Sequence, residues 1–206
     1  MSVLVLVRGD LYRSFRGEST GEHIEDQMKA LKSLRKYVIG PLLCKYVVTV
    51  VIDCNCLGRL HEIANEHVQT AFDLSKIKII LNTPEERPNT QHDSIKGLIG
   101  RNDILIREHN YTVIVRADLH YDKIPYPETL PNDKVIAMCP HIYGSKQAND
   151  IFWVCPQKLY KPFLDYHTNS KYKGKLLNMP DKLPIEYTTT TRYGASHEWV
   201  NPFYHY

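Results

Sequence analysis

Residues 111–122 hold the side chains whose types and spacing are best suited to chemistry. Residues 112–115 form a short β-branched run, typical of a strand that is buried on both faces of a sheet. The run stops at Arg116-Ala-Asp118, which predicts a carboxylate at the carboxyl edge of the sheet, where open α/β sheets bind ligands. A carboxylate there loses solvation unless a cation meets it, and a divalent metal or Arg116 would do so. The alternative is an ordinary surface aspartate that ends a strand.

A second polar segment follows the first predicted strand, residues 3–7. Residues 8–17 contain three arginines and two glycines, beginning with Arg8 and Gly9. Glycine lets the backbone approach a ligand closely, and arginine side chains match phosphate oxygens. The segment therefore predicts either a phosphate-binding loop or, as the alternative, a plain solvated loop.

Both segments belong to a predicted α/β pattern. Apolar runs predict strands over residues 3–7, 46–52, 77–81, 112–116 and 135–139. The first helix is expected to begin after a capping box at Ser19 and Glu22 and to end at Gly40-Pro41, and Asn55 is a candidate cap for the second. Further helices are expected over residues 93–105 and 156–166. This alternation predicts a Rossmann-like domain whose central sheet is mixed, mostly parallel and flanked by helices.

The chain of 206 residues suits a single domain, residues 1–206. From residue 167 the apolar periodicity fades, apart from a β-prone run at residues 185–192. Residues 167–206 are therefore expected to form an irregular C-terminal segment that closes over a site.

The composition bounds the class of protein. Hydrophobic residues make up 43% of the chain and charged residues 24%, which is ordinary for a globular protein, and the net charge of +3 does not argue for a nucleic-acid partner. No membrane span or signal peptide is expected, and an odd number of cysteines, five, favours a reducing, cytoplasmic location. Fourteen tyrosines suit wet surfaces such as sugar-binding clefts.

The cysteines offer a weak alternative, a zinc site. Cys54 and Cys56 lie near His61, and Cys139 lies near His141. Their spacing does not match the usual finger or ribbon patterns, so buried structural cysteines are the favoured interpretation. Neither a dinucleotide-binding G-x-G-x-x-G after a strand nor a phosphate-binding G-x-x-x-x-G-K-[ST] occurs in the sequence.

Residues 111–119, followed by Asn149-Asp150 and the apolar run after it, resemble glycosyltransferases of the GT-A fold. The D-x-D motif of these enzymes is often reduced to an x-x-D that still holds a metal. The whole chain is similar to the glycosyltransferase domains with which chlorella viruses modify their major capsid protein. The resemblance implies a GT-A-like domain that transfers a hexose, or a deoxyhexose such as rhamnose, from a UDP-sugar with Mn²⁺ or Mg²⁺. It implies a glycan or glycoprotein acceptor, such as a viral capsid glycan, in the host cytoplasm.

The resemblance also implies a set of site residues. Asp118 would hold the metal, and because Arg116 stands at the first acidic position of D-x-D, His120 or His197 would supply a second ligand. Asp150 would be catalytic, as general base, nucleophile or hydroxyl anchor; the alternative is a turn residue at a strand entry. Residues expected against the nucleotide-sugar are Arg8, Gly9, Tyr12, Arg13 and Asp53, with Arg101 or Arg116 nearby.

Two other functions remain open. A sugar nucleotidyltransferase shares this architecture, but its triphosphate needs a loop richer in glycine than residues 8–17. A non-catalytic carbohydrate-binding module would depend on the tyrosines and would not need Asp118.

Overall fold

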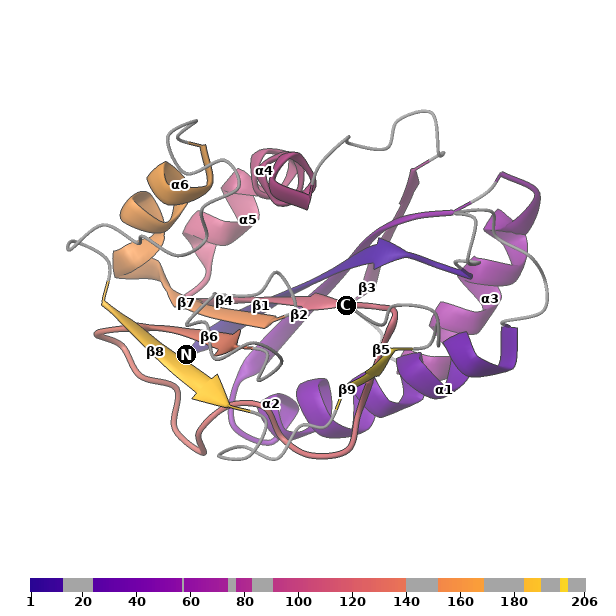
Figure 1. Ribbon diagram of the computed structural model, residues 1–206, viewed down its shortest axis with the longest axis horizontal. Helices are drawn as coiled ribbons and strands as arrows, with labels where there is room; N and C mark the ends of the chain where they lie inside the picture. The colour runs from indigo at the N-terminus through magenta and orange to yellow at the C-terminus, as the bar shows by residue number, and fades with distance from the viewer. Residues whose placement is uncertain are drawn as a thin grey trace.

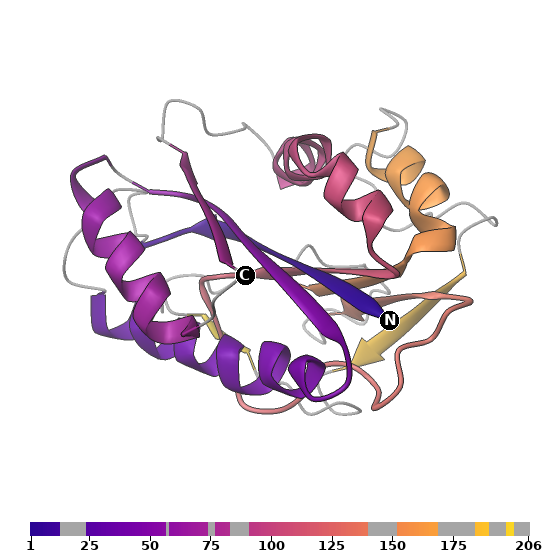
Figure 2. The same cartoon turned by 180° about the vertical axis from the view of Figure 1, so that it is seen from behind.

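The computed structural model describes residues 1–12, 24–56, 58–73, 77–82, 91–139, 152–168, 184–189 and 197–199 (Figure 1). Side chains are described for these residues except 91–93, 138–139, 166–168, 185–189 and 197–199. A twisted sheet runs through the middle of the molecule, with helices on both of its faces (Figures 1 and 2). The predicted α/β architecture is therefore confirmed.

Seven strands form the main sheet in the order β3-β2-β1-β4-β7-β6-β8. The strands are β1 (Ser2–Asp10), β2 (Val47–Asn55), β3 (Ile77–Asn82), β4 (Tyr111–Arg116), β6 (Val135–Cys139), β7 (Phe152–Pro156) and β8 (Ile185–Thr189). Neighbouring strands are parallel except where β7 lies between β4 and β6, antiparallel to both. The sheet is thus mixed and mostly parallel, as predicted, and β8 falls in the β-prone run of the C-terminal segment. A second, antiparallel ribbon pairs β5 (Leu119–Tyr121) with β9 (His197–Trp199).

The apolar run of β1 is continuous because both faces of the sheet are covered. Val5 and Val7 belong to one buried cluster, and Leu4 and Leu6 belong to another. Successive side chains of a strand point to opposite faces, so each cluster receives alternate residues.

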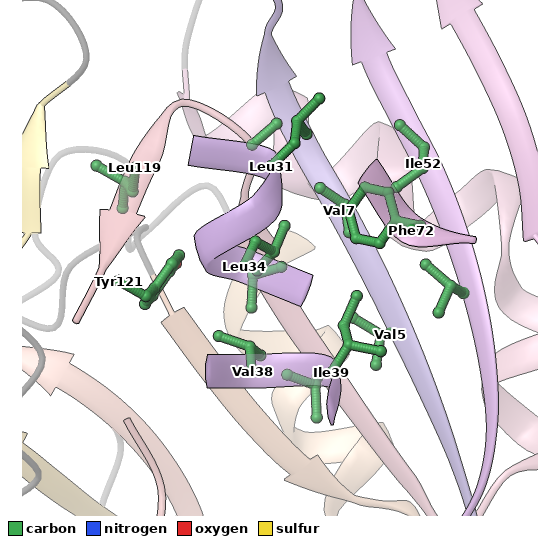
Figure 3. Packing of buried hydrophobic residues seen from close by; sticks show 14 of the residues in the cluster. Val5, Val7, Leu31, Leu34, Val38, Ile39, Ile52, Phe72, Leu119 and Tyr121 are labelled. Carbon is green, nitrogen blue, oxygen red and sulfur yellow. The ribbon is translucent and has the colours of Figure 1, made fainter. Parts of the chain in front are cut away.

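One face is covered by α1 (Ile24–Leu34) and α3 (His61–Phe72). Leu31 and Leu34 of α1 pack towards Val5 and Val7 of β1 (Figure 3). The first helix does not end at Gly40-Pro41 as expected: it continues through a π-helical segment, Arg35–Ile39, into α2 (Gly40–Leu43). Pro41 lies in the first turn of α2, a position at which helices accept proline.

The other face is covered by α4 (Gln91–Arg101), α5 (Asp103–Glu108) and α6 (Tyr160–Thr168) (Figures 1 and 2). The single helix expected over residues 93–105 is in fact two helices, because the chain turns at Asn102, whose side-chain amide donates back to the Leu98 carbonyl at 2.9 Å. Trp153 of β7 meets Phe163 of α6 edge to face, with ring centroids 5.4 Å apart. Within the part of the chain that the structure describes, no helix has the length and apolar character that a bilayer crossing demands.

Truncation of Leu34 tests the packing of α1. Leu34 is fully buried, so Leu34→Ala removes apolar contacts and leaves a cavity, and we expect the free energy of unfolding to fall by about 2–5 kcal/mol. The measurement is urea unfolding followed by circular dichroism. Lys32→Ala, at an exposed position of the same helix, is the control and should change stability by less than about 0.5 kcal/mol. Equal effects of the two substitutions would contradict the placement of α1.

Candidate functional site

A row of charged side chains crosses three neighbouring strands near the carboxyl end of the parallel part of the sheet. Asp53 of β2 is the register partner of Arg8 of β1, and Arg8 is the register partner of Arg116 of β4. The three residues therefore project from the same face. All three are buried, with 3–4% of their surface exposed. Charges at this depth are stable only when opposite charges or hydrogen bonds compensate them.

Arg116 is compensated by Asp118, two residues further along the chain. The Arg116 guanidinium donates two hydrogen bonds to the carboxylate, from Nε to Oδ1 at 2.8 Å and from Nη2 to Oδ2. The two side chains are 5% and 10% exposed. Asp118 thus follows the carboxyl end of β4, as predicted, but it is a buried ion-pair partner and not a surface residue that ends a strand.

Gly9 has no side chain, and the Asp118 carboxylate packs in the space beside its Cα. Its φ of +123° lies in the region that favours glycine, and a Cβ at this position would come within 3.3 Å of the Asp118 Oδ1. The structure therefore brings together three of the predicted site residues, Gly9, Arg116 and Asp118.

Asp53 forms a second fork with Arg101, at the last residue of α4. Arg101 donates from Nε to Oδ2 at 2.9 Å and from Nη2 to Oδ1 at 2.8 Å, and the Asn82 amide donates to Oδ1 at 2.9 Å. The Asp53 side chain is fully buried, whereas the Arg101 side chain is 45% exposed. Arg101 therefore neutralises a buried carboxylate while part of its guanidinium arm stays open to solvent.

A row of short polar side chains follows at the strand ends. Asp10, Asn55 and Asn82 are register partners across β1, β2 and β3, and the Asn55 amide donates to Asp10 Oδ1 at 2.8 Å. Asn55 was a candidate helix cap, but it does not cap α3, because β2 extends to Asn55 and α3 begins only after Leu60. The two asparagines were not predicted as site residues. Their position at the ends of two predicted strands was the available signal.

Gln27 of α1 was also missed, although it joins the two strand ends that carry the site. Its side-chain oxygen accepts from the Tyr12 backbone N–H at 3.2 Å, and its amide donates to the Ala117 carbonyl at 2.8 Å. Ala117 in turn donates its backbone N–H to the Arg8 carbonyl at 2.8 Å. Gln27 is 1% exposed, so it acts as a buried clamp between the segments after β1 and β4. Its spacing of four residues from Leu31 and seven from Leu34 places it on the apolar stripe of the helix, which was the available signal.

Tyr12 points towards α3. It is 1% exposed, and its hydroxyl lies 2.8 Å from Nδ1 of His67. Burial raises the pKa of the Tyr12 phenol, so it stays protonated at neutral pH. Its backbone φ of 56° lies in the left-handed region, so the chain turns sharply two residues after the end of β1.

The remaining predicted site residues are placed only in part. His120 is half-buried in β5, where it is the register partner of Glu198, and the backbone of His197 pairs with Tyr121. Asp150 and Arg13 lie outside the described residues, as does the His197 side chain. Among the side chains that are described, no three of the types His, Cys, Asp and Glu gather as a metal site.

The chemistry around Asp118 fits a divalent cation under one condition. Carboxylate oxygens are the ligands that Mn²⁺ and Mg²⁺ prefer, and the guanidinium on Asp118 shows that this position favours positive charge. Both oxygens already accept hydrogen bonds from Arg116, however. A metal would therefore have to share the Asp118 carboxylate with Arg116 or displace it, and it would need further oxygens from a bound ligand.

Cys54 and Cys56 of the alternative zinc site are buried, as favoured, whereas the Cys139 side chain and His141 lie outside the described residues. Cys54 donates from Sγ to the Val7 carbonyl at 3.7 Å, and His61 donates from Nε2 to the Cys56 carbonyl at 3.0 Å. Burial raises the pKa of the Cys56 thiol to about 11, which disfavours the thiolate that a metal needs.

Removal of Gln27 tests its role as a clamp. Gln27→Leu leaves the Tyr12 N–H and the Ala117 carbonyl buried without this partner, so we expect a loss of about 1–3 kcal/mol in the free energy of unfolding. Gln69→Leu, at an exposed position of α3, is the matched control and should leave stability unchanged. Urea unfolding of both variants is the measurement, and a neutral Gln27→Leu would show that the clamp contributes nothing.

Comparison with known proteins gives the fold. No family model and no curated protein matches the chain. Solved structures match over nearly its full length: HddC from Yersinia pseudotuberculosis is 14% identical with a TM-score of 0.54, covering 98% of this chain and 95% of that one. Mouse xyloside xylosyltransferase 1 in its apo form is 11% identical with a TM-score of 0.53, covering 93% and 86%. A nucleoside-diphosphate-sugar pyrophosphorylase from Vibrio cholerae RC9 is 9% identical with a TM-score of 0.51, covering 91% and 91%. The chain therefore has the expected GT-A-like fold.

Proposed function

We propose that the chain is a glycosyltransferase that takes its sugar from a nucleoside-diphosphate donor, with a UDP-sugar as the first candidate. The observation that carries the proposal is the pair of buried arginines, Arg8 and Arg116, side by side at the carboxyl ends of β1 and β4 with Asp118 beside them. Ligands of open α/β sheets bind at this edge. Guanidinium groups held there match the oxygens of a diphosphate in both charge and geometry.

The nucleoside would lie over the neighbouring strand ends. Asp10, Asn55 and Asn82 present amide and carboxylate groups at the ends of β1, β2 and β3, and Arg101 is half exposed beside Asp53. Such groups supply the donors and acceptors that a base and a ribose require. The polar side chains thus continue in the direction in which a nucleotide would extend from its phosphates.

Asp118 would hold Mn²⁺ or Mg²⁺ in the ternary complex, with His120 or His197 as a further ligand. A bound metal would offset the charge that develops on the departing diphosphate. Asp150 remains the proposed catalytic carboxylate. In its support, β7 runs antiparallel to β4 with Phe152 opposite Val115, so β7 begins at the edge where β4 ends. The proposed acceptor is a glycan or glycoprotein, with a viral capsid glycan as the specific candidate.

The second candidate is a sugar nucleotidyltransferase, because the pyrophosphorylase from Vibrio cholerae shares the fold. The two functions differ in the substrate that brings the phosphates. A transferase binds the finished nucleotide-sugar and releases a nucleoside diphosphate, whereas a nucleotidyltransferase joins a nucleoside triphosphate to a sugar phosphate and releases pyrophosphate.

A donor screen separates the two functions. We expect UDP release from at least one UDP-sugar in the presence of Mn²⁺, faster with a glycan acceptor than with water alone. A parallel reaction with UTP and sugar 1-phosphates should release no pyrophosphate. The reverse pattern would establish the nucleotidyltransferase and overturn the proposal.

Asp118→Asn tests the centre of the site. Because the substitution removes the counter-charge of a buried arginine, we expect a stability loss on the order of 3 kcal/mol as well as a fall of roughly 100-fold in kcat/KM. Urea unfolding and UDP-release kinetics measure the two effects. Asp103→Asn is the matched control, since Asp103 pairs with Arg107 on the surface, and its turnover should be unchanged. Near-normal turnover of folded Asp118→Asn would remove Asp118 from the site.

A further inference from the structure

Among the described residues, the Arg116 guanidinium is the partner that binds the Asp118 carboxylate in the free protein. The two groups form a fork that engages both carboxylate oxygens, in surroundings that leave them 5% and 10% exposed. A buried pair of this kind is held in place because removing either partner leaves an uncompensated charge in a medium of low polarity. A free cation in solution therefore competes with a guanidinium that is covalently tethered two residues away.

The backbone between the two residues is held independently of their ion pair. Ala117 donates its N–H to the Arg8 carbonyl at 2.8 Å and accepts from the Gln27 side chain at 2.8 Å. The turn is thus fixed by hydrogen bonds on both sides.

A second arginine lies beside this ion pair. Arg8 is the register partner of Arg116 and is equally buried, so two guanidinium-bearing side chains stand on adjacent strands, with Asp118 bound to Arg116 and Asp53 in register with Arg8 on its other side. A diphosphate that entered here would give Arg116 a new anionic partner. Asp118 would then need a replacement cation, because a carboxylate left unmatched at this depth is costly.

We propose that Arg116 and a divalent cation compete for Asp118, and that a nucleoside diphosphate decides between them by taking Arg116 as its own partner. The inference rests on the proposed function, since it assumes that the diphosphate binds at this edge. Its consequence is that cation and nucleotide bind cooperatively. Thermodynamic linkage requires the effect to be reciprocal, so each ligand raises the affinity for the other by the same factor.

Mn²⁺ titrations of the full chain, followed by the electron paramagnetic resonance signal of free Mn²⁺, test the exchange. For the unaltered protein we expect weak Mn²⁺ binding alone and binding that is about tenfold or more tighter with saturating UDP. In Arg116→Gln the competing charge is gone, so Mn²⁺ should bind more tightly without UDP, and UDP should add little. If Arg116→Gln binds Mn²⁺ no better than the unaltered protein in the absence of UDP, the competition does not exist.

Two further variants keep the test decisive. Arg107→Gln removes a guanidinium from a surface ion pair and should leave Mn²⁺ binding unchanged with and without UDP. Arg116→Lys keeps the charge but loses the two-point fork, so its Mn²⁺ affinity without UDP should lie between those of the unaltered protein and Arg116→Gln. It replaces Arg116→Gln in the test if that variant fails to fold. UDP binding is measured separately by calorimetry. Absence of UDP binding would contradict the proposed function. The Mn²⁺ titrations without UDP would still decide whether Arg116 competes with the metal.

Discussion

Charge buried at the end of a strand has to be matched, and this requirement organises the carboxyl edge of the sheet. Asp53, Arg8 and Arg116 stand in register across β2, β1 and β4 at a depth that water barely reaches. Arg101 of α4 compensates Asp53, and Asp118 compensates Arg116. The position of α4, the tight turn after β4 and the glycine at the end of β1 together bring these partners within hydrogen-bonding distance.

Core and site are consecutive parts of the same strands. On the face that α4, α5 and α6 cover, Leu6, Val51 and Ile114 belong to the apolar cluster, and each is followed two residues later by a charged residue of the row. A shift of one residue in register would send these charges to the opposite face, among the apolar residues beneath α1 and α3. The packing that stabilises the sheet therefore also fixes the direction in which the charged side chains point.

The sequence predicted β1, β2, β3, β4 and β6 because each contains an apolar run, and runs of that kind need only local information, whereas the short strands β5 and β9 were not predicted. It also identified Arg116 as one of two cations that could meet Asp118. The limits of the first helix and the break at Asn102 were missed, since a π-helical segment and an amide that bonds back to its own helix leave no clear mark in the periodicity. Gln27 was missed for a different reason: its partner Ala117 is 90 residues away, and such long-range bonds exist only once the sheet has formed.

Gly9 carries a consequence for how this sequence can vary. Its backbone conformation disfavours every other residue, and its missing Cβ is what lets the Asp118 carboxylate approach the end of β1. A side chain at position 9 would therefore be strained by its backbone conformation and would also press on the Asp118 carboxylate. Natural variants of this domain that keep the backbone of β1 should therefore keep glycine at position 9, whatever residue they carry at position 118.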